Sequence, residues 1–197
     1  MGLSPYKCTK PSVIIIAATI SLYPEEAYRN GLTMATVATR RPSHDILSPQ
    51  VKSLNYLNNV MAKVDAIQAG AEEGLMLNDV GLVAECTGDN LFIVRDGVIS
   101  TPPLTSGALD GITRRVVFEI AADLRIPIRE RDLSRHDVFT ADECFLTGTA
   151  AEVIAAVKLD QRAIGSGKPG PITQRIIARF HELTQTTGTP VDASGDV

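Results

Sequence analysis

The chain has 197 residues, of which 44% are hydrophobic and 21% are charged, a composition typical of a globular protein with one sizeable core. The net charge is −4 and no basic block is present, which argues against a nucleic-acid-binding surface. The longest apolar run, 13–18, is too short to cross a bilayer, and nothing before it has the apolar core of a signal peptide. Cys8, Cys86 and Cys144 have no CxxC spacing and no neighbouring histidine pair. We therefore expect a reduced cytoplasmic protein with neither a disulfide nor a metal site.

The first part of the chain predicts alternating strands and helices, from β-branched runs, apolar periodicity and turn-forming residues. In chain order these are a buried strand over 12–17, a short helix over 23–30, a strand over 32–37, a loop over 40–50, a helix over 54–69, a strand over 73–77 and a turn over 78–81. The longer helix has one apolar face, made of Leu54, Leu57, Val60, Met61, Val64 and Ile67.

The second part continues in the same way, and its clearest element is a hairpin around Asp96-Gly97, because Asp-Gly suits a tight two-residue turn. The expected elements are hairpin strands over 91–94 and 98–100, a helix over 111–125, strands over 126–128, 143–147 and 152–157, a loop over 164–171 and a helix over 172–183. Helices and strands interleave without an internal repeat, which predicts an α/β fold. The residues after 183 are polar, and we expect 188–197 to be a disordered tail.

One helix start has the properties of an anion-binding site. Gly111 opens the helix over 111–125, so its backbone allows a close approach. The free N–H groups of the first turn and the positive end of the helix dipole favour an anion there. Thr113 adds a hydroxyl donor, so a phosphate would be held without a lysine. The same residues also fit an ordinary capped helix.

Three further positions could carry chemistry. Lys52 lies where a polar loop meets an apolar helix, so its amine could be partly desolvated and act as a nucleophile or base, although a solvated lysine fits as well. Tyr56 lies one helical turn further on, on the same predicted face. Glu85 follows an apolar run and could be buried beside a cationic partner, as one half of a structural ion pair. Gly148-Thr149-Ala150 ends a strand and offers further anion donors.

Four segments in this order resemble the class IV aminotransferases, which are pyridoxal-phosphate enzymes of fold type IV. They are Lys52-Ser53-Leu54-Asn55-Tyr56-Leu57, Glu85-Cys86-Thr87-Gly88-Asp89-Asn90-Leu91-Phe92, Gly111-Ile112-Thr113-Arg114 and Thr147-Gly148-Thr149-Ala150-Ala151-Glu152. The segments 22–26 and 37–41 resemble the branched-chain amino acid aminotransferases within that class. The resemblance extends over about 3–183.

The resemblance implies a role for each matching residue. Lys52 matches the catalytic lysine that forms a Schiff base with pyridoxal 5′-phosphate and moves a proton at the substrate Cα. Tyr56 matches the tyrosine that binds the phenolic oxygen of the cofactor, and Glu85 matches the carboxylate that faces the pyridine nitrogen. Leu109 matches the residue packed against the ring.

The remaining matches concern anion binding. Gly111, Ile112, Thr113 and Thr149 match the phosphate cradle. Thr149 and Ala150 match the backbone donors that lie near the substrate carboxylate. No metal takes part in the reaction of the family.

The resemblance also implies a domain organisation. Residues 1–187 correspond to the large C-terminal, cofactor-binding domain of a D-amino-acid aminotransferase-like fold, and the small N-terminal domain is missing. The implied reaction moves the amino group of leucine, isoleucine or valine to 2-oxoglutarate, in a cytoplasmic homodimer serving amino-acid biosynthesis. We expect the chain to bind the cofactor and to turn over weakly or not at all.

Three alternatives remain at this stage. A D-amino-acid aminotransferase or an aminodeoxychorismate lyase would need the same lysine, glutamate and phosphate cradle. A lone domain without catalytic competence would also keep these residues. Cys8, His44, His136 and His181 lie in no motif, and we interpret them as structural or surface residues.

Overall fold

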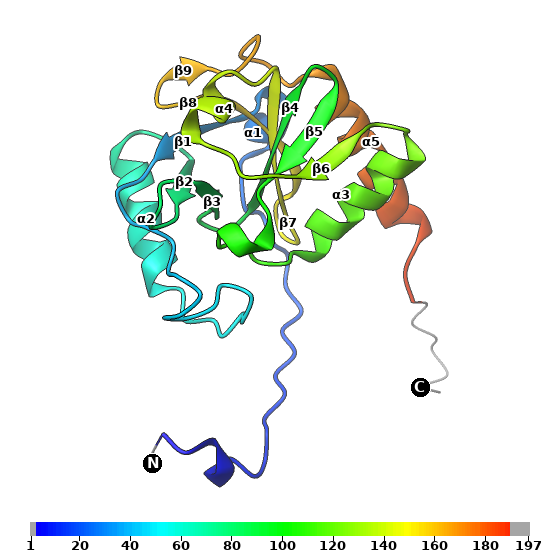
Figure 1. Cartoon of the computed structure of the whole chain (residues 1–197). Helices are drawn as coiled ribbons and strands as arrows, with labels where there is room; N and C mark the ends of the chain where they lie inside the picture. Colours follow the sequence, from blue (N-terminus) through cyan, green and yellow to red (C-terminus); the bar gives the residue numbers. More distant parts are fainter. Residues whose placement is uncertain (1–2, 190–197) are drawn as a thin grey trace.

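One mixed β-sheet organises the part of the chain that the structure, a computed structural model, describes, which is residues 3–189 (Figure 1). Its strands are β1 (Leu32–Thr36), β2 (Glu73–Leu77), β3 (Val83–Cys86), β4 (Asn90–Arg95), β5 (Val98–Thr101), β6 (Ile128–Glu130), β7 (Glu143–Gly148), β8 (Glu152–Leu159) and β9 (Arg162–Ala163). The strand order is β3-β2-β1-β8-β7-β4-β5-β6, and β9 pairs with β8. β1 runs parallel to β2 and β8, and β5 runs parallel to β6, while the other pairs are antiparallel.

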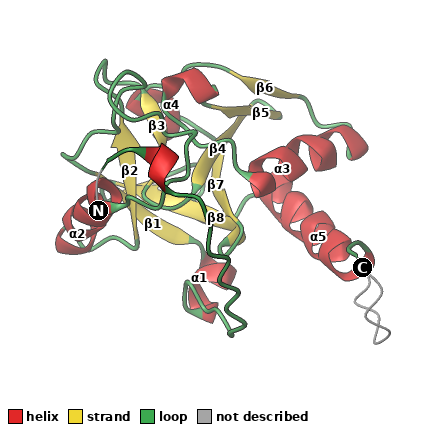
Figure 2. Ribbon diagram, turned by 90° about the horizontal axis from the view of Figure 1, so that it is seen from below, coloured by secondary structure: helices red, strands yellow, loops and turns green. Residues whose placement is uncertain are grey.

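The helices are α1 (Glu25–Asn30), α2 (Leu57–Gln68), α3 (Ile112–Asp123), α4 (Arg135–Phe139) and α5 (Pro171–Thr186), with 3-10 turns at Pro5–Lys7 and Leu104–Ser106. α3 and α5 pack side by side against β7, and α2 lies against β2 at the other end of the molecule (Figure 2). This interleaving confirms the α/β class. No helix within the described residues is long and apolar enough to cross a membrane.

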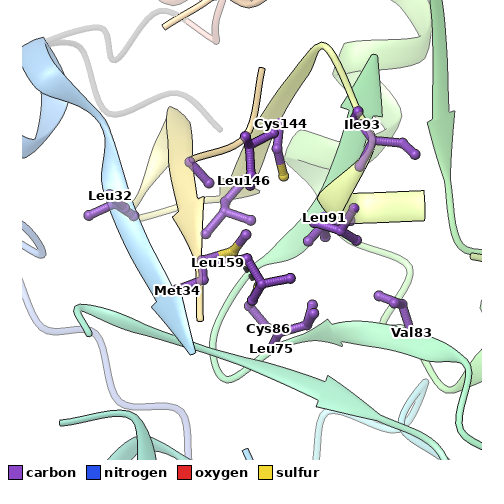
Figure 3. Packing of buried hydrophobic residues seen from close by; sticks show 14 of the residues in the cluster. Leu32, Met34, Leu75, Val83, Cys86, Leu91, Ile93, Cys144, Leu146 and Leu159 are labelled. Atoms are coloured by element: carbon purple, nitrogen blue, oxygen red, sulfur yellow. Dashed lines mark hydrogen bonds between the residues drawn. The ribbon is translucent and has the colours of Figure 1, made fainter. Parts of the chain in front are cut away.

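The sheet curls around one apolar core. Leu75, Cys86, Leu91 and Leu146 come from four different strands and meet in this core, where each is at most 1% exposed (Figure 3). A second core lies on the opposite face of β4 and β7, beneath α3 and α5. There the rings of Phe92 and Phe145 stack with centroids 4.9 Å apart. Burial on both faces of the central strands accounts for their continuous apolar runs.

The predicted elements after residue 20 are largely confirmed. Asp96 and Gly97 both have positive φ, 51° and 76°, as the tight turn between β4 and β5 requires. The strand expected over 126–128 begins two residues later, as β6, and the last helix extends to Thr186. Three short elements, α4, β9 and β3, were not predicted from the sequence. Most of the predicted tail, from 190 onward, lies outside the described residues.

The strand predicted over 12–17 is wrong. These residues form no strand, and Val13, Ile14, Ile15 and Ile16 are each more than 80% exposed. The segment extends away from the sheet (blue in Figure 1), and within residues 3–189 no strand pairs with its backbone. The β-branched residues of this run favour an extended backbone, but a strand also needs a neighbouring strand to pair with, and the described residues provide none here.

The predicted orientation of α2 is also wrong. The helix begins at Leu57 because Leu54 has φ of 64°, which ends any helical path through that residue. Its buried side chains are Asn59, Ala62 and Ala66. The predicted apolar face is between 40% and 73% exposed at every position, namely Leu54, Leu57, Val60, Met61, Val64 and Ile67. The small alanines allow close packing on β2, where a Cβ at Gly74 would lie only 3.3 Å from the Ala62 carbonyl oxygen.

A pair of neighbouring substitutions tests this orientation. Ala66→Leu should lower the free energy of unfolding by about 1–3 kcal/mol, because the added atoms must fit a site that is 0% exposed. Ile67→Lys should change it by less than about 0.5 kcal/mol, because Ile67 faces solvent. Urea unfolding at concentrations where the protein is monomeric measures both. Equal losses would mean that α2 is turned the other way.

Candidate active site

One cavity of about 520 Å³ brings together every residue that the sequence analysis assigned to the site. It lies between the segment before α2, the turn from β3 to β4, the start of α3 and the turn from β7 to β8. The predicted residues on its wall are Lys52, Tyr56, Glu85, Leu109, Gly111, Ile112, Thr113, Thr149 and Ala150. An adjoining cavity of about 440 Å³, beneath the loop over 42–53, shares Lys52 and Tyr56. The roles given to these residues remain predictions.

Lys52 and Tyr56 form a pair at the rim of the cavity. The Lys52 Nζ donates a hydrogen bond of 2.6 Å to the Tyr56 hydroxyl and lies 4.8 Å from the centre of its ring. Lys52 precedes α2, so an extended turn rather than the predicted helical face brings the two side chains together. The amine is exposed, which leaves it accessible to a ligand.

Glu85 forms the buried floor of the cavity and is 5% exposed. Its carboxylate lies 2.5 Å from the Arg41 guanidinium and accepts hydrogen bonds from the Asn90 side-chain amide (2.9 Å) and the Leu109 N–H (2.8 Å). Burial raises the pKa of Glu85 to about 7, while Arg41 and the Leu109 N–H favour the ionised form. These contacts keep a carboxylate in an apolar surrounding.

Arg41 was not assigned to the site from the sequence. It is 8% exposed and also donates to the Gly107 carbonyl oxygen and the Asn59 side-chain oxygen, at 3.0 Å each. The only signal was that a buried Glu85 needs a cation, and several arginines in the chain satisfied that condition equally well. The structure selects Arg41.

Asn90, also missed, explains why residue 111 is a glycine. The Asn90 side-chain amide donates to Glu85 and to the Leu109 carbonyl oxygen (2.9 Å). Its side-chain oxygen occupies the space that a Cβ at Gly111 would need. The close approach expected at Gly111 is therefore made by Asn90, and the backbone there has an ordinary φ of −69°.

The anion-binding end of the cavity combines a helix start with hydroxyl groups. α3 begins at Ile112, and the N-cap residue Gly111 provides no side-chain cap for the first-turn N–H groups. Thr113 is 5% exposed, and Thr149 projects from the turn between β7 and β8. The Thr147 Oγ1 is buried and has no hydrogen-bond partner within residues 3–189. Such an arrangement favours a ligand that carries hydrogen-bond acceptors and negative charge.

The cavity thus combines an accessible primary amine, a buried carboxylate and a donor-rich anion site. An amine can bond covalently to a carbonyl ligand, while the helix start holds an anionic group of the same ligand. Among the described residues on its wall, Lys52 is the only lysine, arginine or histidine. The arrangement fits a ligand with a carbonyl and a phosphate.

The sequence pattern of the amino-transferase class IV family matches residues 1–159. The chain belongs to this family. The branched-chain-amino-acid aminotransferase homologue of Methanocaldococcus jannaschii is 44% identical, over 97% of this chain and 65% of its own length. The branched-chain-amino-acid aminotransferases of Pseudomonas aeruginosa and Escherichia coli K12 are 40% and 37% identical, over 88% and 93% of this chain and 57% and 60% of their own lengths. The chain therefore spans about 60% of these relatives.

Solved structures give the same result for the fold. The Escherichia coli branched-chain amino acid aminotransferase superposes with a TM-score of 0.80 at 38% identity, covering 81% of this chain and 53% of that chain. The T.th. enzyme complexed with N-(5′-phosphopyridoxyl)-L-glutamate superposes with a TM-score of 0.79 at 40% identity, covering 81% of this chain and 54% of that chain. The expectation of a fold type IV α/β domain is confirmed.

Removal of the Arg41 charge should make the buried Glu85 carboxylate destabilise the folded protein. Arg41→Met should lower the free energy of unfolding by about 3–5 kcal/mol at pH 8, because an unpaired carboxylate remains buried. Burial already raises the folded-state pKa of Glu85 to about 7, so the folded state binds this proton more tightly than the unfolded state. Stability of the variant should therefore fall as the pH rises through 7 and partly recover at pH 5.

The double variant Arg41→Met/Glu85→Gln is the matched control. It removes both charges, so it should regain most of the lost stability and lose the pH dependence. Guanidinium unfolding at pH 5 and pH 8 makes the comparison. A loss in Arg41→Met that is the same at both pH values would contradict the assignment of the ion pair.

Two glycines on the cavity wall provide a further test. Gly111→Ala should lower the free energy of unfolding by about 1–3 kcal/mol, because the new methyl group displaces Asn90 from Glu85. Gly88→Ala should have an effect below about 0.5 kcal/mol, because no atom lies within 4 Å of a Cβ built there. Thermal unfolding of both variants checks the difference, and equal losses would exclude the proposed contact with Asn90.

Proposed function

We propose that this chain binds pyridoxal 5′-phosphate on Lys52 and is the cofactor-binding part of a branched-chain amino acid aminotransferase. Such an enzyme moves the amino group of leucine, isoleucine or valine to 2-oxoglutarate. The observation that carries the proposal is the meeting of the Lys52 amine, the Glu85 carboxylate and the start of α3 in one cavity.

The residues present fit this cofactor. The helix start, Thr113 and Thr149 would hold a phosphate, and the Thr147 hydroxyl, which has no hydrogen-bond partner in the described part of the chain, offers a further donor on the same cavity wall. The exposed Lys52 amine lies on the wall of the same cavity, where it would meet an aldehyde. Leu109 adds an apolar side chain to the same cavity wall.

The chain's own residues have distinct tasks in this proposal. When bound, pyridoxal phosphate supplies a ring that withdraws electrons from the substrate Cα. Lys52 would accept and return the Cα proton at Nζ, and the 2.6 Å hydrogen bond to Tyr56 would orient its amine. Arg41 favours the ionised form of Glu85, which would place negative charge near the ring nitrogen.

The names of the relatives support the substrate class. Proteins that are 37% and 40% identical carry the name branched-chain-amino-acid aminotransferase, and so do the structural neighbours. The exposed apolar stripe on α2 supports a homodimer, since an apolar surface of this kind marks a contact with another protein. The free cysteines Cys8, Cys86 and Cys144 support a reducing, cytoplasmic location.

The proposal is tested by adding pyridoxal phosphate to the purified chain, followed by borohydride reduction and peptide mass mapping. We expect the label on Lys52 in the wild-type chain and no label in Lys52→Ala. Lys158→Ala, which removes an exposed lysine on β8, should label like wild type. Labelling that persists in Lys52→Ala would overturn the proposal.

Substrate class is tested separately. With 2-oxoglutarate as the amino acceptor, the loaded chain should convert L-leucine to its 2-oxo acid only slowly, and D-leucine should remain unchanged. Conversion of the D-isomer alone would instead support a D-amino-acid aminotransferase. Because the chain spans about 60% of its relatives, the same assay is repeated with a full-length relative as the positive control.

A further inference from the structure

Three acidic side chains meet beside the cavity, in a cluster that the proposed chemistry does not use. Tyr23 precedes α1, Glu73 begins β2 and Asp89 lies in the turn between β3 and β4. They are 7%, 2% and 3% exposed. The Tyr23 hydroxyl lies 2.9 Å from Glu73 Oε2 and 2.9 Å from Asp89 Oδ2.

The Tyr23 hydroxyl makes two close contacts with carboxyl oxygens, and both can be hydrogen bonds only when one of the two carboxyl groups is protonated. A phenol has one hydrogen, so it donates to only one carboxylate. If both carboxylates were ionised, the phenol oxygen would face a bare carboxylate oxygen at 2.9 Å without a hydrogen between them. One of the two carboxyl groups must therefore donate to Tyr23.

The surroundings show which carboxyl group holds the proton. Burial opposes the ionisation of Glu73, but nearby donors stabilise its charge, and the net effect lowers its pKa. These donors are the Lys63 amine (2.9 Å), the N–H groups of Gly74 (2.8 Å) and Thr87 (3.0 Å), and the Thr87 hydroxyl. Asp89 has no side-chain partner other than Tyr23 within the described residues. Burial, and then the charge of Glu73, raise the pKa of Asp89 to about 6.

Asp89 also contacts the anion-binding edge of the cavity. Its Oδ1 occupies the space that a Cβ at Gly148 would need, and Gly148 precedes Thr149 in the turn between β7 and β8. Asp89 itself lies on the cavity wall. The charge state of this carboxyl group therefore acts directly on the part of the cavity that would hold an anion.

We propose that Asp89 is a positioning residue whose protonated form donates to Tyr23, which in turn donates to Glu73, and that this relay holds the Gly148–Thr149 turn in place for an anionic ligand. Loss of the Asp89 proton breaks the relay and adds a negative charge at Asp89, beside the anion site, to the charge that Glu73 already carries. Anion affinity should then fall. The inference rests on the proposed function in taking the cofactor phosphate as the anion.

Other titratable groups face this cluster, and their titration must be distinguished from that of Asp89. They are Lys63 from α2, Glu85 and Cys86 from β3, and Tyr28 from α1. Burial raises the pKa of both Tyr28 and Cys86, which keeps these groups neutral near pH 6. Of these four groups, Glu85, whose pKa is raised to about 7, is the one that could titrate in the same range.

The first measurement is a carbon NMR titration of the wild-type chain with labelled aspartate carboxyl groups, in which glutamates such as Glu85 give no signal. Asp89→Asn identifies the resonance. We expect Asp89 to titrate near pH 6. Titration near pH 4, the usual range for aspartate, would overturn the proposal, and this experiment needs no ligand.

The second measurement compares pyridoxal phosphate affinity at pH 5.5 and pH 7.5, by fluorescence quenching. Asp89→Asn keeps the shape and donor ability of the protonated acid. It should bind within twofold of wild type at pH 5.5 and roughly three- to tenfold more tightly at pH 7.5, because the variant lacks the negative charge that ionised Asp89 places near the anion. The second ionisation of the ligand phosphate is common to both proteins and cancels.

Asp110→Asn is the matched control, because Asp110 lies on the same cavity wall but pairs with Arg115 at 3.4 Å instead of joining the cluster. It should change affinity by the same factor at both pH values. Identical pH profiles for wild type and Asp89→Asn would overturn the proposal. If pyridoxal phosphate binds to neither protein, the proposed function is wrong, and inorganic phosphate serves as the anion in the same comparison.

Discussion

The ion pair between Arg41 and Glu85 is the interaction on which the rest of the site depends. Both side chains are less than 10% exposed, so each charge would be costly without the other. Arg41 is bound in addition to the Gly107 carbonyl and to Asn59 of α2, and Glu85 is bound to Asn90 and the Leu109 N–H. These contacts join the loop after β1, helix α2, strand β3 and the segment before α3. A charge pair that is saturated with hydrogen bonds thus sets the relative position of the elements around the cavity.

A rigid floor and an exposed rim follow from this arrangement. Glu85 and Thr113 are buried and belong to a regular strand and helix, whereas Lys52 and Thr149 are exposed and lie in connecting segments. Groups that act through fixed charge benefit from rigid supports, because the free-energy cost of orienting them arises during folding and not during the reaction. A lysine that must bond to a ligand and also move a proton needs the freedom of a loop. The division of the site matches the tasks proposed for its residues.

The sequence predicted the site better than it predicted the packing around it. The residues on the cavity wall carry local signals: a glycine before an amphipathic helix, a lysine before another, and a glutamate after an apolar run. Arg41 and Asn90 were missed because their partners lie 44 and 5 residues away and only the folded sheet brings the side chains together. The cluster of Tyr23, Glu73 and Asp89 was missed for the same reason, since Tyr23 is 50 and 66 residues from its partners.

The two wrong predictions have a common physical cause, and it bears on the reactive lysine. The run 12–17 and the apolar stripe of α2 are patterns that require cover, but a pattern does not say which surface provides it. Leu57 and Met61 of that stripe line the cavity of about 440 Å³ that also contains Lys52. A protein surface that covered the stripe would therefore exclude water from the neighbourhood of the Lys52 amine. The contact that buries this apolar surface would therefore also enclose the place where Lys52 is proposed to bond to a carbonyl.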